Sequence, residues 1–166
     1  MAYFNNGVTI AGDSGSIFDP VLCELAYRWW CPAGGQVVDP FAGGSVRGIV
    51  AGALGMRYWG CDLRAEQIAA NEAQADEIET APRPEWLCGD SLEHLDSAPQ
   101  ADFVFSCPPY GDLEKYSDDP ADLSTMEWHT FAAAYGRIIL RAMTVLKPNR
   151  FACFVVGDFR DKNGFY

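Results

Sequence analysis

The sequence predicts a single α/β domain built on a doubly wound, mostly parallel sheet with helices on both faces. Its 166 residues, 49% of them hydrophobic, suffice to bury one core and exclude a collagen-like or disordered chain. Short apolar runs alternate with longer segments whose apolar residues recur at helical spacing, as in strands joined by crossover helices. Polar, glycine or proline residues follow each run, and ligands of such sheets bind beyond the carboxyl ends of the strands.

The first helix is predicted from the residues at its two ends. Residues 1–18 show no sustained periodicity and are expected to form an irregular leader. Asp19 is a capping residue directly before Pro20, and proline is favoured at the first position of a helix. Apolar residues follow at helical spacing until residues 31–35, where proline and glycine end the helix.

The remaining elements alternate between strands and helices. Compact apolar runs predict the strands, and apolar periodicity or a run rich in alanine and glutamate predicts the helices. The long aromatic and aliphatic side chains at Trp29, Phe131, Ile138 and Leu140 are expected in the core. The predicted strands are 36–39, 57–62, 85–88, 102–106 and 150–156, the helices are 46–54, 65–78 and 126–146, and an acidic loop covers 111–124.

The segment after the first strand indicates a ligand-binding loop. Residues 39–45 read Asp-Pro-Phe-Ala-Gly-Gly-Ser. Glycine lets the backbone approach a ligand closely, and the next helix begins with free N–H groups. The segment is neither Gly-x-Gly-x-x-Gly nor followed by Gly-Lys-Ser/Thr, which argues against the dinucleotide and P-loop fingerprints.

Aspartates end the second and third strands. Asp62 lies about 20 residues after Asp39, the spacing at which an acidic side chain meets the ribose hydroxyls of a nucleoside. Asp90 closes the third strand, where a side chain can reach the base of that nucleoside. Taken alone, Asp62 is equally well explained as a helix cap, and Asp90 as part of a turn-forming Asp-Ser pair. Three aspartates on consecutive strand ends together favour a nucleoside site.

The segment after the fourth strand is the sharpest motif. Residues 106–110 read Ser-Cys-Pro-Pro-Tyr. Two prolines impose an extended turn, because proline donates no hydrogen bond and restricts the residue before it. Such a turn can aim a carbonyl at an amino group while the tyrosine ring stacks on a flat base. The first and fourth strands are neighbours in a doubly wound sheet, so we expect this turn to face the glycine-containing loop.

Together the two motifs resemble those of S-adenosylmethionine-dependent DNA amino-methyltransferases, which modify adenine N6 or cytosine N4, and more narrowly DNA methylases of phage and prophage origin. The resemblance extends from Phe18 to Asp158 and implies a Rossmann-like sheet of the class I methyltransferase type. It implies a catalytic domain over residues 1–166. The residues it implies for cofactor binding are Phe18, Asp19, Asp39, Pro40, Phe41, Ala42, Gly43, Gly44, Asp62, Leu63, Asp90 and Ser91, and those for catalysis are Ser106, Cys107, Pro108, Pro109 and Tyr110.

The resemblance also implies a mechanism on DNA. The target base is flipped out of the duplex and stacked on Tyr110. The carbonyl of Pro108 and the first side chain of the motif accept hydrogen bonds from the exocyclic amine, which orients the nitrogen for direct transfer of a methyl group from S-adenosylmethionine. No metal and no covalent enzyme intermediate is implied. Adenine N6 is slightly favoured over cytosine N4.

One position departs from the family pattern. The first motif residue is usually Asp, Asn or Ser, and here it is Cys107, whose thiol is a weak acceptor. Two interpretations stay open: Cys107 is a tolerated substitute and Pro108 is the main acceptor, or Ser106 reaches the amine. A covalent role for the thiol is disfavoured, since cytosine C5 methylation uses Pro-Cys and not Cys-Pro-Pro-Tyr.

Two other functions compete with DNA methylation. The first is methylation of RNA or of protein amide nitrogens, because similar proline turns hold planar amino and amide groups there. The second is a noncatalytic methyltransferase-like subunit, and Cys107 is the feature in its favour.

The formal charge of −11 shows that the domain cannot hold DNA by charge alone. The resembled family usually has two further strands, so we expect either a chain truncated at its C-terminus or a minimal enzyme whose sheet is completed by a partner subunit. A partner subunit or homodimer would also supply target recognition. The six cysteines lack zinc-type spacing and no secretory leader is present, which predicts a reduced cytoplasmic protein. The resemblance implies that its cell is bacterial or phage-infected. The protein's basic surface is expected either on a segment absent here or around Arg47, Arg64, Arg137, Arg141, Lys147 and Arg160.

Overall fold

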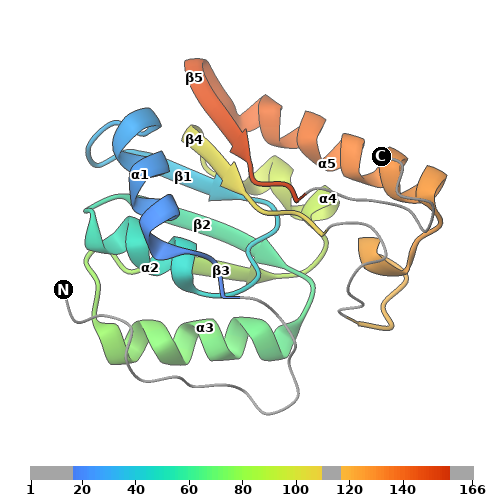
Figure 1. Cartoon of the computed structure of the whole chain (residues 1–166), viewed down its shortest axis with the longest axis horizontal. Coiled ribbons are helices and arrows are strands. Elements are labelled where there is room, and N and C mark those ends of the chain that lie inside the picture. Colours follow the sequence, from blue (N-terminus) through green and yellow to red (C-terminus); the bar gives the residue numbers. More distant parts are fainter. Residues whose placement is uncertain (1–16, 110–116, 158–166) are drawn as a thin grey trace.

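Five strands form one sheet in which every pairing is parallel (Figure 1). The strand order is β3-β2-β1-β4-β5, so β1 and β4 are neighbours and the strand order reverses between them, as predicted. The computed structural model describes residues 17–109 and 117–157. The strands are β1 (Gln36–Asp39), β2 (Arg57–Asp62), β3 (Glu85–Cys88), β4 (Ala101–Ser106) and β5 (Leu146–Phe154).

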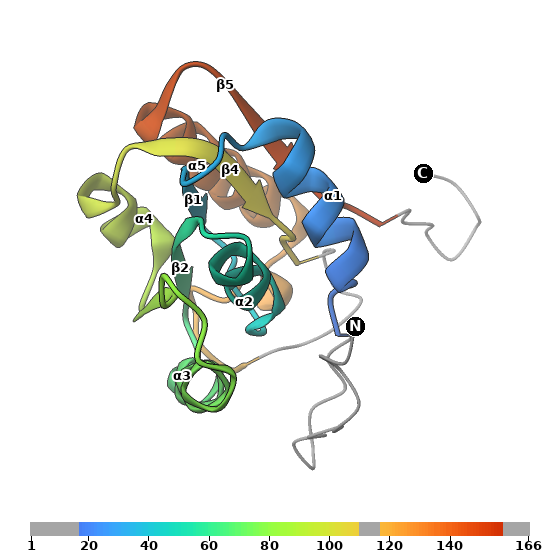
Figure 2. The same cartoon turned by 90° about the vertical axis from the view of Figure 1, so that its left-hand side faces the viewer.

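Helices cover both faces of the sheet, and each face has its own hydrophobic core (Figures 1 and 2). Neighbouring residues of a strand point to opposite faces, so Val37 packs under α1 and α2 while Val38 packs under α5. In the described part of the chain no helix is both long and apolar enough to cross a membrane. The helices are α1 (Pro20–Trp30), α2 (Val46–Ala53), α3 (Ala65–Ile78), α4 (Ser91–His94) and α5 (Trp128–Val145), with 3₁₀ turns at Leu95–Ser97 and Leu123–Thr125.

The start of α1 confirms the capping prediction. The Oδ1 of Asp19 accepts hydrogen bonds from the N–H groups of Val21 at 2.8 Å and Leu22 at 3.3 Å. The residue before it, Phe18, packs edge-on against Phe105 with ring centroids 5.7 Å apart. The sequence places Phe18 in the irregular leader, but in the structure its half-buried ring packs against the core cluster that contains Phe105. Residues 1–16 of the predicted leader lie outside the described residues.

The last helix and strand differ in detail from the prediction. β5 begins at Leu146, directly after α5, instead of at Arg150. Its ladder with β4 is irregular between Leu146 and Phe151, and Asn149 in this stretch has a φ of 57°. Residues 147–149 therefore interrupt the strand as a bulge, whereas the sequence predicted that they separate helix from strand.

Part of the predicted core is exposed. Phe131 and Ile138 are buried as predicted, but Trp29 is 67% exposed and Leu140 is 69% exposed. The reason is helix geometry: Trp29 comes two residues after the buried Tyr27, which turns it about 200° around the helix and away from the sheet.

Asp102, at the start of β4, joins three strands at their amino ends. Its Oδ2 accepts hydrogen bonds from the N–H of Gln36 at 3.0 Å and from the Lys147 ammonium at 2.9 Å, and Nε of Arg150 lies 3.4 Å from Oδ1. Burial acts to raise the pKa of Asp102, but the hydrogen bond and charge of Lys147, the N–H of Gln36 and the charge of Arg150 lower it by more. The pKa therefore lies below the ordinary value of 3.8.

We expect Asp102→Asn to lower the free energy of unfolding by about 1–3 kcal/mol at pH 7, since Lys147 and Gln36 lose a charged acceptor. A folded-state pKa below the unfolded-state value gives a stabilisation that is present above about pH 4 and lost as the pH falls through the folded-state pKa. In urea unfolding, the difference between wild type and variant should shrink from about pH 5 to about pH 2. A difference independent of pH would contradict this assignment.

Candidate functional site

The structure brings the predicted segments together at the carboxyl ends of β1 to β4. We call residues 39–45 the glycine loop and residues 106–109 the proline turn. The glycine loop is bonded to β2 by the N–H of Ala42, which donates to the carbonyl of Cys61 at 2.9 Å. It is bonded to the start of α4 by the hydroxyl of Ser91, which donates to the carbonyl of Pro40 at 2.5 Å. Strand ends that are far apart in sequence thus form one surface, as predicted.

Asp39 is completely buried, and four groups share its carboxylate. Oδ2 accepts hydrogen bonds from Nε of Arg47 at 2.6 Å and from the hydroxyl of Tyr58 at 2.7 Å. Oδ1 accepts from the hydroxyl of Ser106 at 2.5 Å and from the N–H of Phe41 at 3.1 Å. These donors use all four lone-pair directions of the carboxylate. Direct contact of Asp39 with a cofactor stays a prediction, which this geometry does not favour.

We call Asp39, Arg47, Tyr58 and Ser106 the Asp39 network. Burial alone would lower the pKa of Arg47, but the adjacent Asp39 carboxylate raises it by more, so the guanidinium stays charged. Burial, reinforced by Asp39, raises the pKa of Tyr58 well above its ordinary value, so its hydroxyl keeps the proton that it donates. The network is therefore one buried ion pair with two neutral donors.

Ser106 lies inside this network. Its side chain is fully buried, and its hydroxyl donates to Asp39 and accepts the N–H of Phe41 at 3.1 Å. The hydroxyl therefore joins the proline turn to the glycine loop. The catalytic role of Ser106 stays a prediction, and in this structure its hydroxyl is committed to Asp39 and Phe41.

Asp62 holds the tip of the glycine loop. Its Oδ2 accepts the N–H of Gly43 at 2.8 Å, and its Oδ1 accepts the N–H of Arg64 at 3.0 Å. Burial raises the pKa of Asp62 above its ordinary value, although these N–H donors partly offset the effect. The amide of Asn71 fixes the loop from α3 by donating to the carbonyl of Gly43 at 2.7 Å. Gly43 has a φ of +49°, a conformation that suits glycine.

The third strand end carries Asp90, as predicted. Its Oδ1 caps α4 by accepting the N–H of Leu92 at 2.8 Å, and Gly89 before it donates its N–H to the carbonyl of Asp62 at 2.9 Å. Asp90 is therefore a helix cap, where the sequence offered a turn-forming Asp-Ser pair as the alternative. Its contact with a nucleoside base stays a prediction. Leu63, also predicted here, is half-buried beside Asp62.

The proline turn comes directly after β4. Cys107 and Pro109 are half-buried and Pro108 is buried, while Tyr110 lies outside the described residues. The ring of Phe41 in the glycine loop lies 6.0 Å from that of Tyr135 on α5, tilted by 35°. Burial raises the pKa of Tyr135, and the neighbouring Cys107 adds to the effect. An aromatic pair thus stands beside the turn.

The acidic loop predicted over 111–124 is described only from residue 117. Asp122, one of the acidic residues of this predicted loop, is buried. Its Oδ1 accepts the N–H of Ser124 at 2.8 Å and its Oδ2 accepts the hydroxyl of Ser117 at 2.8 Å. It caps the adjoining 3₁₀ turn. The Asp122 carboxylate therefore holds residues 117–124 together through these hydrogen bonds.

Four residues of the site were not predicted to belong to it: Arg47, Tyr58, Asn71 and Gly60. Arg47 had a usable signal, because it is the only charge in the apolar helix 46–53 and follows Asp39 closely in the sequence. Gly60 permits the close approach of β2, since a Cβ there would lie 2.9 Å from the Cβ of Ala42. Nothing in the sequence around Asn71 marked its bond to the loop.

The prediction of a basic surface is corrected at Arg47. Arg47 is 4% exposed and belongs to the Asp39 network. Arg141 pairs with Asp96 at 2.6 Å, and Lys147 pairs with Asp102 at the amino edge of the sheet. Arginine in an apolar helix beside a buried carboxylate turns inward for pairing, which composition alone does not reveal. Arg160 lies outside the described residues.

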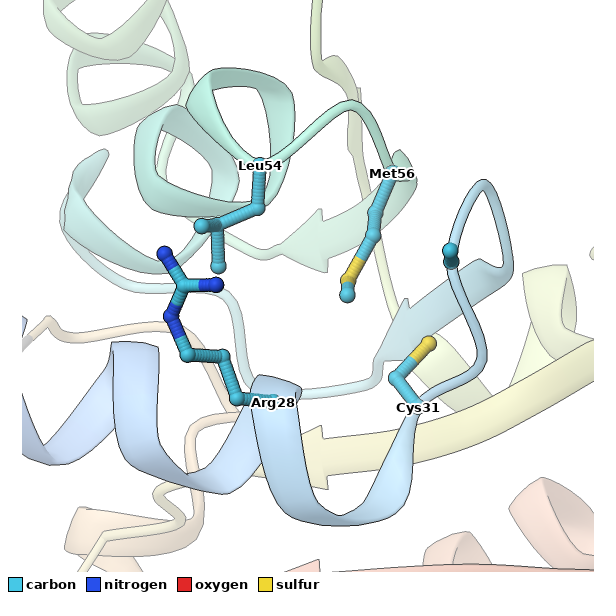
Figure 3. Close-up of a pocket in the computed structure, with 5 residues that line it drawn as sticks. Arg28, Cys31, Leu54 and Met56 are labelled. Carbon is cyan, nitrogen blue, oxygen red and sulfur yellow. The ribbon is translucent and has the colours of Figure 1, made fainter.

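A pocket of about 240 Å³ lies at the other end of the strands from the glycine loop and the proline turn (Figure 3). Met56 directly precedes β2, which places the pocket at the amino ends of the strands. Burial raises the pKa of Cys31 to about 12, so this thiol keeps its proton at neutral pH. Among residues 17–109 and 117–157 no three His, Cys, Asp or Glu side chains are grouped to hold a metal ion. The pocket is lined by Arg28, Cys31, Ala33, Leu54 and Met56.

Comparison with known proteins supports the fold. No protein-family model matches the sequence. The chain is similar to TrmN from Thermus thermophilus, with 17% identity and a TM-score of 0.67, over 84% of this chain and 38% of that chain. It is similar to an S-adenosylmethionine-dependent methyltransferase from Agrobacterium tumefaciens, with 15% identity and a TM-score of 0.62, over 86% and 44% of the two chains.

A third similar structure is an rRNA methylase from Streptococcus thermophilus, with 8% identity and a TM-score of 0.60, over 86% of this chain and 74% of that chain. These likenesses confirm the predicted fold class, an α/β, Rossmann-like sheet of the class I methyltransferase type. The chain spans less than half the length of TrmN and of the Agrobacterium protein.

Proposed function

We propose that this protein transfers a methyl group from S-adenosylmethionine to the exocyclic amino group of a base in DNA, at adenine N6 in preference to cytosine N4. The observation that carries the proposal is the joining of the glycine loop to the proline turn through the Asp39 network. In a class I methyltransferase fold these two segments are where cofactor and acceptor meet, and here they share one carboxylate. The motif sequences favour an amino group as the acceptor.

The residues at the glycine loop fit this cofactor. Gly44 is exposed, and a Cβ built on it would meet no atom of residues 17–109 and 117–157 within 4 Å, so these residues leave space open beside the loop. Asp62 ends β2 and Asp90 follows β3 at the same end of the sheet, and their carboxylates suit ribose hydroxyls, an adenine amine and a positive sulfonium. When bound, S-adenosylmethionine supplies an electrophilic methyl group. The loop, Asp62 and Asp90 would hold it in place.

The proline turn would position the acceptor. Proline carbonyls that no helix uses can accept hydrogen bonds from an amino group, and the half-buried Cys107 adds a weak acceptor. Phe41 and Tyr135 present an aromatic pair at the same place, which suits a flat base. Placement of the amine nitrogen by these groups accounts for much of the rate in a direct transfer.

RNA is the second candidate substrate. One similar structure is an rRNA methylase, although at 8% identity that likeness establishes only the fold. Arg141 and Lys147 are already paired with carboxylates, so DNA binding would depend on a partner or on further chain for its positive charge.

The test is methyl transfer from isotope-labelled S-adenosylmethionine to DNA, RNA and protein in parallel, followed by mass spectrometry of the nucleosides. We expect label in DNA as N6-methyladenine or N4-methylcytosine. Label confined to RNA or protein would replace the proposed substrate, and cofactor binding without transfer would indicate a noncatalytic subunit.

In the same assay Cys107→Asp and Cys107→Ser are expected to keep or raise activity, because carboxylate and hydroxyl are better acceptors than a thiol. Cys153→Ser, on β5, serves as the matched control. Complete loss of transfer in both Cys107 variants would refute the assigned role of the turn.

A further inference from the structure

Arg47 makes contacts that no part of the proposed reaction requires. Its Nη2 donates to two successive carbonyls of the glycine loop, Phe41 at 2.7 Å and Ala42 at 2.9 Å, while its Nε holds Asp39. The hydroxyl of Tyr27 donates to its backbone carbonyl at 2.9 Å, and the ring of Phe18 lies 4.7 Å from its guanidinium carbon. The side chain of Arg47 is therefore charged and buried, and it is bonded to the backbone of the glycine loop.

We propose that Arg47 is a positioning residue that, through the Asp39 carboxylate, ties the glycine loop to the proline turn. The inference rests on the proposed function, because it takes the loop as the cofactor site and the turn as the acceptor site. Arg47 itself would touch neither ligand. Its effect on both would pass through Asp39, Phe41 and Ser106.

The geometry of the carboxylate explains the coupling. One oxygen of Asp39 is held by Arg47 and Tyr58, which prevents the carboxylate from rotating. The other oxygen receives Ser106 of the turn, whose hydroxyl also accepts the N–H of Phe41. A shift of the guanidinium therefore moves loop and turn together. In a buried site these polar contacts are strong and mutually dependent.

Lysine cannot replace this arrangement. The guanidinium is a planar fork that serves a carboxylate and two carbonyls at once, whereas an ammonium is a single point charge. Arg47→Lys therefore keeps the charge next to Asp39 but gives up part of the connection to the loop. Ser106→Ala keeps the ion pair and removes only the link to the turn.

The test is a double-mutant cycle on the affinity for S-adenosylhomocysteine, measured by calorimetry. We expect Arg47→Lys and Ser106→Ala each to weaken binding about tenfold, and the double variant to weaken it about as much as one of them, because both act through one carboxylate. Independent effects would multiply to about a hundredfold and would overturn the inference. Arg28→Lys, an exposed arginine paired with Glu24 on α1, should bind like wild type.

Hydrogen exchange gives a second readout without ligand. Arg47→Lys should speed exchange at the N–H of Phe41 and also at Val155, whose N–H donates to the carbonyl of Ser106 at 2.9 Å. Faster exchange at Phe41 alone would overturn the coupling. If Arg47→Lys does not fold, Ser106→Ala decides the matter by exchange at Ala42 of the glycine loop, whose N–H donates to Cys61 and not to Ser106. Faster exchange at Ala42 is expected, and unchanged exchange there would overturn the coupling. If the wild type does not bind S-adenosylhomocysteine, the proposed function is refuted. Hydrogen exchange would still test whether the glycine loop and the proline turn are coupled.

Discussion

Replacing Arg47 with methionine is expected to lower the free energy of unfolding by about 3–5 kcal/mol, the range for a buried ion pair that loses one partner. Methionine fills similar volume but leaves Asp39, which is fully buried, without its cation. The carbonyls of Phe41 and Ala42 lose their donor as well. Since a domain has about 5–15 kcal/mol in total, urea unfolding followed by tryptophan fluorescence should show a large shift.

Two controls decide the cause of that loss. Asp39→Asn combined with Arg47→Met removes both charges and should recover part of the stability, because no unpaired charge is then buried. Arg28→Met, at an arginine that is 59% exposed, should change the free energy of unfolding by no more than about 0.5 kcal/mol. An Arg47→Met variant as stable as wild type would show that the ion pair of Arg47 with Asp39 does not stabilise the fold by this amount.

Replacing Asp62 with alanine is expected to weaken the binding of S-adenosylhomocysteine about a hundredfold. The carboxylate accepts the N–H groups of Gly43 and Arg64, and hydrogen bonds to a charged group contribute about 1.5–3 kcal/mol each. Its loss frees the tip of the glycine loop and removes the predicted partner of the ribose hydroxyls. Calorimetry at neutral pH measures the effect directly.

The pH dependence of wild-type binding checks the same residue. Because burial raises the pKa of Asp62, the carboxylate takes up its proton at a higher pH than an ordinary one. Affinity should therefore fall as the pH is lowered through that pKa, and Asp62→Ala should lack this decrease. Asp96→Ala, at an exposed aspartate paired with Arg141, is the matched control. Equal affinities for wild type and Asp62→Ala would remove Asp62 from the cofactor site.

Much of the fold could be predicted because short buried strands leave a simple pattern. The runs at 36–39 and 57–62 are confirmed as strands, since mostly apolar residues between breakers suit a parallel sheet covered on both faces. The run at 85–88 is confirmed as an edge strand, which is only partly buried. The exposure of Trp29 could not be predicted, because the apolar face of α1 is wider than the strip that the sheet covers. The position of β5 depended on a bulge, which is set by its pairing with β4.

Part of the candidate site could also be predicted from the sequence, and part could not. Asp62, the glycine loop and the proline turn were located correctly at strand ends, because the residues next to a strand in the chain must lie at its end in the fold. The direction in which Asp39 and Ser106 point was not predictable, since it depends on donors from β2 and α2 that lie close only after folding.

By itself the sequence determined which segments meet at the carboxyl ends of the strands. Periodicity and breakers locate each strand along the chain, and a parallel sheet places the carboxyl ends of its strands on one side. Only the tertiary structure decided that Asp39 turns inward to Arg47, Tyr58 and Ser106. A buried carboxylate takes the donors that the surrounding elements bring to it, and that set exists only once α2, β2 and β4 have packed around β1.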